Sequence, residues 1–160
     1  MSKSIDFSVE LIRLIDVNIK KAEIDNPEEL KSVFSDGYKL IMRFKFQFAT
    51  ESSSRLAKTY FILNLSATNT ATNKFITCQF EIVYTFFVDQ LPGLLLQKEN
   101  AVIIDTQLGI SMANIAYSTS RGIVFTRCSG TVFDGTILPI LSNSIIENIV
   151  RQEESVVNFD

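Results

Sequence analysis

Histidine and tryptophan are both absent from the 160-residue chain, and glycine is sparse, with six residues. Without histidine, the chain lacks the commonest general base, the usual hydrolase triads and most transition-metal sites. No glycine-rich loop has the spacing that cradles a phosphate, and no GxSxG motif is present. Carboxylates remain, but Glu81 and Asp89, which flank the end of a predicted strand, have no third residue to support catalysis. The sequence therefore predicts a protein that is not an enzyme and that binds no metal or cofactor.

Cysteine is scarce too, and the two residues present, Cys78 and Cys128, form neither a CxxC motif nor half of a zinc site. Cys78 falls on an apolar strand face, where we expect a buried thiol that acts as a small hydrophobic side chain. Residues 1–14 alternate and carry acids, which is not the pattern of a signal peptide, and no uncharged apolar run is long enough to cross a bilayer. We therefore expect a cytoplasmic protein that does not insert into a membrane.

Charge of one sign is not in large excess, because 15 basic and 18 acidic residues give a net charge of −3. No basic stripe with interleaved aromatic side chains is present, so nucleic acid is not an expected partner. A composition of 46% hydrophobic and 21% charged residues is typical of a folded chain, and we expect residues 1–160 to form one domain. The acids of the N-terminal quarter are dispersed among lysines, and we expect them to be solvated: Asp6, Glu10, Asp16, Glu23, Asp25, Glu28, Glu29 and Asp36.

Phenylalanine is the abundant aromatic residue, with 13 copies, and it contributes to the most regular predicted strand, Lys74–Val88. Because successive side chains of an extended backbone point to opposite sides, a period of two gives a strand two distinct faces. One face is continuously apolar and is expected to be core: Ile76, Cys78, Phe80, Ile82, Tyr84, Phe86 and Val88. The other face is mixed, as expected where a sheet meets another protein surface: Thr77, Gln79, Glu81 and Thr85 with Phe75, Val83 and Phe87.

Three further strands are predicted. The first runs from Ile5 to about Ile24 and alternates imperfectly, with an irregularity near Arg13, and the second, Tyr38–Thr50, alternates cleanly. The third, Leu56–Thr68, is predicted from its apolar residues Tyr60, Phe61, Ile62, Leu63 and Leu65. The last three of the four strands are joined by short polar turns. Short connections favour antiparallel hairpins, since a parallel neighbour needs a much longer crossover. The sequence therefore predicts a four-stranded antiparallel β-meander.

The second half of the chain changes to helical spacing. From about Asn100 to Arg127, apolar residues recur at intervals near three and four, which predicts a long amphipathic helix, although Gly109 and Gly122 would weaken it. A loop and a shorter helix over Ser142–Gln152 follow, and the acidic tail beyond is expected to fray. The predicted fold class is therefore α+β, with the meander covered by the long helix and with a shorter C-terminal helix.

Several short motifs occur within these elements. Tyr117-Ser118-Thr119-Ser120-Arg121 lies within the long helix, Gly130-Thr131 and Leu138-Pro139-Ile140 lie in the loop after it, and the long strand ends in Phe86-Phe87-Val88. In these motifs and in the order of its elements, nearly the whole chain resembles the SecB family of protein-export chaperones and its SecB-like relatives. The family's Cys-Pro and Phe-Pro-Tyr elements and its late Asp-Phe are missing, and Gln79 stands where export-type members tend to carry an acid that contacts the translocation motor.

The resemblance implies a homotetramer, built as a dimer of dimers, that holds unfolded polypeptide in long apolar grooves without ATP. The implied clients are chains for export or, as for some SecB-like relatives, an antitoxin, and the translocation motor is a further implied partner. Candidate groove residues are aromatic: Phe44, Phe46, Phe48, Tyr60, Phe61, Phe86 and Phe87. Candidate residues of a subunit or partner interface are Phe75, Gln79, Glu81 and Val83, and structural roles are expected for Tyr117, Arg121, Gly130 and Pro139.

Other interpretations stay open at this stage. Each phenylalanine of the groove set can equally be ordinary core, because alternating phenylalanine usually packs under a covering element. Arg121 can tie the helix to the sheet instead of contacting a ligand. For the whole protein, the alternatives are a carrier of a lipid or small hydrophobic ligand, with the helix closing a curved sheet over an apolar cavity, and a structural oligomerisation module.

Overall fold

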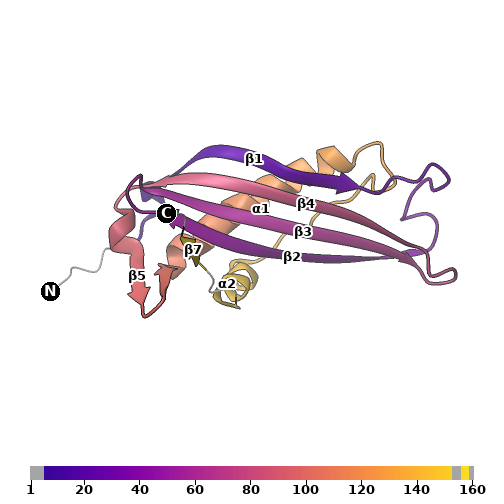
Figure 1. Ribbon diagram of the computed structural model, residues 1–160. Coiled ribbons are helices and arrows are strands. Elements are labelled where there is room, and N and C mark those ends of the chain that lie inside the picture. The colour runs from indigo at the N-terminus through magenta and orange to yellow at the C-terminus, as the bar shows by residue number, and fades with distance from the viewer. Residues whose placement is uncertain (1–5, 153–155, 159–160) are drawn as a thin grey trace.

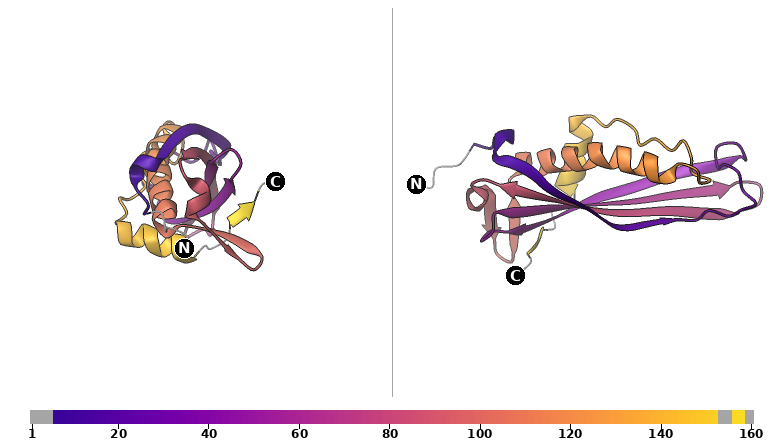
Figure 2. Two further views of the ribbon diagram at one scale, coloured as in Figure 1. Left: turned by 90° about the vertical axis from the view of Figure 1, so that its left-hand side faces the viewer. Right: turned by 90° about the horizontal axis from the view of Figure 1, so that it is seen from above.

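The computed structural model describes residues 6–152 and 156–158, which form an elongated molecule (Figure 1). Long strands make one layer, and a long helix lies across one face of it (Figure 2). The predicted α+β class is therefore confirmed. The elements in chain order are η1 (Val9–Leu11), β1 (Ile12–Ile24), β2 (Tyr38–Glu51), β3 (Leu56–Asn69), β4 (Phe75–Val88), η2 (Leu91–Leu94), β5 (Leu95–Lys98), β6 (Ala101–Ile104), α1 (Thr106–Cys128), α2 (Asn143–Gln152) and β7 (Val156–Asn158).

The large sheet has the strand order β1-β4-β3-β2-β7. Strands β2, β3 and β4 are consecutive antiparallel hairpins, as the sequence predicts. The connectivity differs from a plain meander at β1, which pairs antiparallel with β4, with Ile12 opposite Val88 and Ile24 opposite Cys78. The loop after β1 therefore crosses the end of the sheet to reach β2 on the far side (Figure 1).

Strand β1 is shorter than predicted, because the 3₁₀ turn η1 precedes it and the strand begins only at Ile12. Ile5 lies outside the described residues. The predicted irregularity near Arg13 is present as a register shift between Leu14 and Asp16, and a second shift lies between Ile19 and Lys21. Such bulges increase the local twist of a strand, which suits β1 to a curved edge of the sheet.

The core lies between the sheet and α1. All seven residues of the predicted apolar face of β4 are buried, none more than 6% exposed. They pack with the alternate residues of β3 that face the same way, such as Phe61 and Leu63, and with Leu108 and Met112 of α1. Burying a large apolar side chain stabilises the fold by about 1.5–3 kcal/mol, so this layer is the main source of stability.

Helix α1 begins at Thr106, so the predicted start at Asn100 is wrong. The preceding residues form the β5–β6 hairpin, in which Leu95 lies opposite Ile104, and the continuous apolar run Ala101–Ile104 is its second strand. The helix starts where Asp105 caps it: its carboxylate accepts the backbone N–H groups of Gln107 at 2.9 Å and Leu108 at 3.1 Å. Such a cap satisfies amides that have no partner within the helix and fixes the helix start.

The two glycines of α1 do not interrupt the helix. A Cβ on Gly109 would lie 3.1 Å from Ile104 Cδ1 and 3.2 Å from Val150 Cγ1, so this glycine allows α1 to approach both β6 and α2. A Cβ on Gly122 would meet no atom within 4 Å in the described chain. The first glycine is thus a packing residue, and the second leaves a smooth patch on the helix surface.

The C-terminal part follows the prediction as far as α2, which begins one residue later than expected. Of the acidic tail, residues 153–155 and 159–160 lie outside the described residues. Val156–Asn158 forms β7, which was not predicted and which pairs parallel with Phe48–Thr50 of β2. Within the described ranges, no helix is long and apolar enough to cross a membrane.

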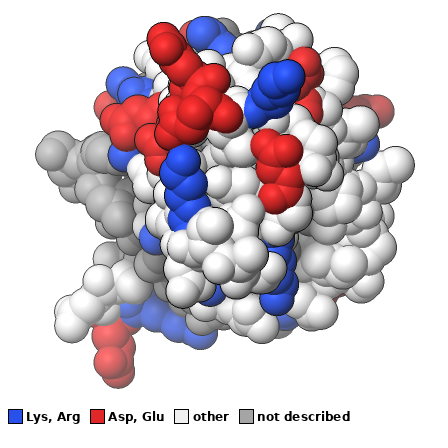
Figure 3. All heavy atoms as spheres, turned by 90° about the vertical axis from the view of Figure 1, so that its right-hand side faces the viewer, with Lys and Arg blue, Asp and Glu red and all other residues white. Residues whose placement is uncertain are grey.

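The eight acids predicted to be solvated are all exposed, which confirms that prediction. Figure 3 shows acidic and basic side chains side by side at the end of the molecule where the β1–β2 loop and the β3–β4 turn lie. Two of these acids have partners on β4 or beside it: Glu29 accepts from Lys74 Nζ at 3.0 Å, and Asp25 accepts from the backbone amide of Thr77 at 2.9 Å. These contacts fasten the long β1–β2 loop to the end of the sheet.

Candidate functional site

Four aromatic rings meet between β2, β3 and α1. The ring centroid of Phe44 lies 6.0 Å from that of Phe46, 5.8 Å from Phe61 and 5.3 Å from Tyr117. Phe46 and Phe61 are fully buried, whereas Phe44 is half-buried. Tilted and edge-to-face pairs at such distances add about 0.5–1.5 kcal/mol each beyond simple burial. The cluster joins three of the groove candidates to Tyr117, and only Phe44 among these three is open to solvent.

Phe44 belongs to an apolar strip on the helix-facing side of β2. Leu40 and Met42 lie on the same side and are half-buried like Phe44, because α1 does not fully cover this end of the strand. The α1–α2 loop runs beside the strip: Tyr117, whose ring contacts Phe44, donates its hydroxyl to the carbonyl oxygen of Pro139 at 2.8 Å. The next residue, Ile140, is 82% exposed. We name the set Leu40, Met42, Phe44 and Ile140 the β2 margin.

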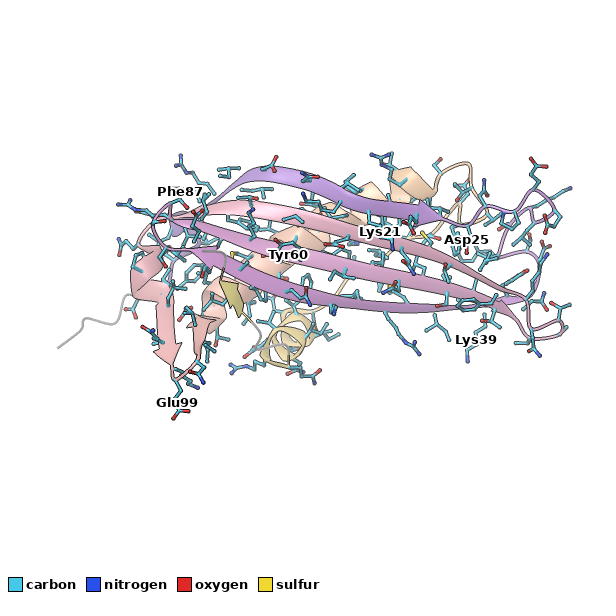
Figure 4. The ribbon with its side chains drawn as sticks, in the orientation of Figure 1. Lys21, Asp25, Lys39, Tyr60, Phe87 and Glu99 are labelled. Carbon is cyan, nitrogen blue, oxygen red and sulfur yellow. The ribbon has the colours of Figure 1, made fainter. Side chains whose placement is uncertain are left out.

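The remaining groove candidates do not join the β2 margin. Phe46, Phe48, Phe61 and Phe86 are at most 3% exposed, so the core interpretation holds for them, because their alternate positions lie under α1 and its flanking elements. Tyr60 and Phe87 lie on the opposite face of the sheet, which α1 leaves uncovered (Figure 4). There the guanidinium of Arg13 lies 5.1 Å from the ring centroid of Phe87 in a cation–π contact.

The four interface candidates all lie on this uncovered face of β4. Phe75 is 59% exposed and Val83 is buried, while Gln79 and Glu81 are half-buried. Lys21 of β1 donates from Nζ to Gln79 Oε1 at 2.7 Å, so the polar residues of this face are partly engaged with the neighbouring strand. Partial burial, with Glu81 nearby as a second cause, raises the pKa of Tyr60. The face is therefore mixed in character, as the sequence predicted.

The four residues with expected structural roles are gathered around the end of α1 and the loop after it. Arg121 donates from Nε to the carbonyl oxygen of Leu138 at 2.9 Å, so it ties α1 to the loop before α2 and not to the sheet. Gly130 turns the chain after α1 with a φ of +75°, a conformation that side chains disfavour. Together with the Tyr117–Pro139 hydrogen bond, these contacts fix the loop that borders the β2 margin.

A basic strip on β2 was not singled out from the sequence. Lys39, Arg43 and Lys45 are exposed on the uncovered face, and they form no ion pair with any residue that the structure describes. A shallow depression of about 260 Å³ lies beside two of them, and it is lined by Arg43, Phe44, Lys45, Ile62 and Asn64. The alternation of charge along β2 is visible in the sequence, but its position beside a strand edge follows only from the sheet order.

The two cysteines also form a relationship that sequence spacing did not reveal. Both are fully buried, Cys78 on β4 and Cys128 at the end of α1. The neighbouring Cys128 thiol, as a hydrogen-bond partner, and burial raise the pKa of the Cys78 thiol. The expected buried, hydrophobic role of Cys78 is confirmed. In the described part of the chain, no three His, Cys, Asp or Glu residues gather as a metal site would require.

The long sheet with order β1-β4-β3-β2, the covering helix and the shorter C-terminal helix together define a SecB-like fold, as the resemblance in the sequence implied. A similar solved structure is that of the Mycobacterium tuberculosis SecB-like chaperone Rv1957 in complex with a ChAD peptide from the Rv1956 HigA1 antitoxin. The two chains share 15% sequence identity with a TM-score of 0.59, over 83% of this chain and 92% of that chain. Scans against protein-family models and against curated proteins find no match.

Proposed function

We propose that this protein is a molecular chaperone that binds unfolded or non-native polypeptide without ATP. The observation that carries the proposal is the SecB-like fold, since a chaperone of that fold, Rv1957, is bound to an antitoxin peptide in its solved structure. An antitoxin is accordingly one client that we propose, and chains destined for export are another. We propose that the protein acts in the cytoplasm and catalyses no reaction.

The β2 margin is the surface that we propose for the client. Leu40, Met42 and Phe44 follow one another along the strand with the spacing of alternate residues in an extended peptide. Ile140 presents most of its side chain to solvent, although it is large and apolar. Covering this surface with a client would gain roughly 25 cal/mol per Å² of apolar area and would demand little sequence specificity.

Self-association is a further part of the proposal, as a homotetramer built from two dimers. In the described residues, the outer edge of β1 has no strand partner, and exposed apolar side chains lie along it: Leu14 at 38%, Ile15 at 54% and Val17 at 37%. On α1, Phe125 is 49% exposed near the smooth patch at Gly122. These two surfaces are the ones that we propose to meet sister subunits. The mixed face with Phe75, Gln79, Glu81 and Val83 is proposed for a partner protein such as the translocation motor.

A carrier for a lipid or small hydrophobic ligand is less well supported. The space between the sheet and α1, where such a ligand would lie, is filled by large side chains that are fully buried, among them Tyr84, Phe80 and Phe133. Side chains of the described residues therefore occupy the place where such a ligand would lie.

Suppression of aggregation tests the proposed function. The purified protein is added without nucleotide to a chemically denatured model enzyme on dilution, and light scattering is followed. We expect equimolar protein to abolish most of the scattering. If scattering is the same with and without the protein at a several-fold excess, the chaperone proposal is wrong.

A variant pair tests the proposed surface. Ile140→Asp removes an exposed apolar side chain of the β2 margin and should raise the concentration needed for half-suppression by about ten-fold, which corresponds to losing the burial of one large side chain. Val9→Asp is the matched control, because Val9 is 61% exposed on η1 and outside the β2 margin. Equal effects of the two substitutions would contradict a client site at the β2 margin.

A further inference from the structure

Strand β2 pairs along its whole length with β3, from Tyr38 opposite Asn69 to Glu51 opposite Leu56. On its other edge, the described residues that pair with it are those of β7, at Phe48–Thr50. From Tyr38 to Gln47, this edge has no strand partner in the described parts of the chain, and the backbone N–H and C=O groups that point outward are free to pair with an added strand. An extended peptide that pairs with such an edge gains main-chain hydrogen bonds, and its alternate side chains contact the neighbouring strand on the two faces of the sheet.

The two faces beside this edge differ in chemistry. On the uncovered side, Lys39, Arg43 and Lys45 lie along the strand, with the exposed Ile41 between Lys39 and Arg43. The three cations are paired across the sheet with the uncharged β3 residues Thr68, Asn64 and Ile62. None of the three cations forms an ion pair with a described residue. Since directly opposed side chains of neighbouring strands come within about 5 Å, a carboxylate on an added strand would reach these cations.

The helix-facing side of the same edge is apolar. It carries Leu40, Met42 and Phe44, each half-buried. In an added strand, alternate side chains would therefore face the apolar residues on the helix side of the sheet and the basic residues on its uncovered side. The peptide that fits this edge is extended, with apolar residues alternating with acidic ones.

The chain already places one segment of its own on β2. Strand β7 lies next to the free stretch and runs parallel to β2, with Val156 opposite Phe48 and Asn158 opposite Thr50. In sequence, the tail that contains β7 is acidic and apolar, with Glu153, Glu154 and Asp160 around Val156 and Val157. The described pairing of β7 with β2 covers three residues, fewer than a typical strand has.

We propose that the free edge of β2 from Tyr38 to Gln47 binds an acidic, extended peptide as an added strand, and that β7 competes for the adjoining end of that edge. The inference rests on the proposed function, whose client class it narrows. Basic residues on an edge strand also discourage sheets from pairing with one another, and that role alone predicts no preference for acidic peptides.

The test uses the full chain and two fluorescein-labelled ten-residue peptides, one alternating valine with glutamate and the other alternating valine with lysine. Fluorescence anisotropy gives the affinity of each. We expect the glutamate peptide to bind at least ten-fold more tightly, and we expect this preference to shrink as salt is added, because exposed charges are screened. A glutamate peptide N-methylated at alternate backbone amides should lose binding. Equal affinity for the glutamate and lysine peptides, or full binding by the N-methylated peptide, would overturn the proposal.

Charge reversal supplies the matched variants. Arg43→Glu combined with Lys45→Glu should invert the preference between the two peptides. Lys20→Glu combined with Lys31→Glu makes the same change in net charge at exposed positions away from the β2 edge and should leave the preference as in the natural chain. If both double variants change the preference equally, the effect belongs to net charge and the β2 edge is excluded.

Truncation after Gln152 removes β7 and tests the competition. The truncated chain should bind the glutamate peptide several-fold more tightly, and unchanged affinity would overturn the role assigned to β7. The aggregation assay separates this inference from the proposed function. A protein that suppresses aggregation yet binds both peptides equally keeps its chaperone role and loses the acidic-strand site. A protein that binds the glutamate peptide through β2 but does not suppress aggregation keeps the acidic-strand site and loses the proposed chaperone role.

Discussion

The phenol oxygen of Tyr84 on β4 lies 2.6 Å from the hydroxyl oxygen of Ser120 on α1, and neither side chain is accessible to solvent. This hydrogen bond joins the two layers inside the apolar core. Tyr84→Phe should lower the free energy of unfolding by about 1–2 kcal/mol, because the Ser120 hydroxyl would stay buried without its partner. Urea denaturation measures the change. Adding Ser120→Ala should recover part of the loss, and a Tyr84→Phe protein as stable as the natural chain would contradict the pairing.

Tyr84 also makes the free energy of unfolding depend on pH in the alkaline range. Burial raises the pKa of Tyr84 to about 12, although the hydrogen bond with Ser120 acts in the opposite direction. An unfolded tyrosine titrates near 10, so the unfolded chain releases its proton first as the pH rises. The stability linked to this group is therefore complete below about pH 10 and is lost between about pH 10 and 12, at up to about 1.4 kcal/mol per pH unit. Tyr84→Phe should show a shallower loss than the natural chain in urea titrations at pH 8 and 11.

The two glycines of α1 should respond in opposite directions to alanine. Gly109→Ala places a methyl group 3.1–3.2 Å from Ile104 and Val150, and overpacking of this kind costs about 1–3 kcal/mol. Gly122→Ala meets no atom in the described chain and should gain up to about 1 kcal/mol from helix propensity. Thermal unfolding of both variants checks the difference. If Gly122→Ala destabilises instead, and also lowers the mass in solution, the patch around Gly122 is covered by another subunit.

The two thiols should be unreactive in the folded protein. Cys78 and Cys128 are fully buried, and the pKa of Cys78 is raised by its hydrogen bond to Cys128 and by burial. Because both sulfur atoms are enclosed in the core, a disulfide reagent such as DTNB should modify neither residue until the chain unfolds, and then both in urea. The raised pKa of Cys78 further disfavours its thiolate, which is the reactive form. Rapid reaction of one thiol per native chain would show that the pair is open to solvent.

The exposed edge of β1 predicts how the chain assembles. Ile15→Glu adds a charge at a side chain that is already 54% exposed, so a single chain should keep its fold. If β1 joins sister subunits, the variant should sediment at a lower mass than the natural protein in analytical ultracentrifugation. Leu96→Glu on β5, at 61% exposure, is the matched control and should leave the mass unchanged. A natural chain that sediments as a monomer would rule out the proposed tetramer.

Local patterns explain which parts of the fold were predictable. Strands β2, β3 and β4 are rich in β-branched and aromatic residues and are bounded by polar turns, so their bounds were predicted to within about one residue. The regular alternation in β4 identified its apolar face completely. The start of α1 was missed because a short apolar run fits both a helix and a strand. Asp105, followed by a helical stretch, was the signal available for the correct start. The pairing of β1 with β4 cannot be recognised from a local sequence pattern, because β2 and β3 lie between the two strands in sequence.

The candidate site was less predictable, for a related reason. Alternation distinguishes the two faces of a strand, but it does not reveal which alternate residues a helix will cover. Phe44 and Phe46 have the same pattern and lie on the same face, but the elements that cover the sheet leave Phe44 half-buried and Phe46 fully buried. Likewise, Arg43 and Lys45 gain their significance from the open edge of β2, which depends on the order of all the strands.

The pairing of β1 with β4 also has a consequence for how the chain is made. The β2–β3 and β3–β4 hairpins close over short turns, whereas β1 can pair only after the whole of β4 has been synthesised. Contacts of such long sequence separation form late in folding, because closing a large loop costs entropy first. The apolar residues Leu14, Ile15 and Val17 are therefore synthesised before β4 and have no partner strand until β4 is complete. During its own synthesis, the protein that we propose to bind unfolded polypeptide is therefore itself an unfolded polypeptide with exposed apolar residues.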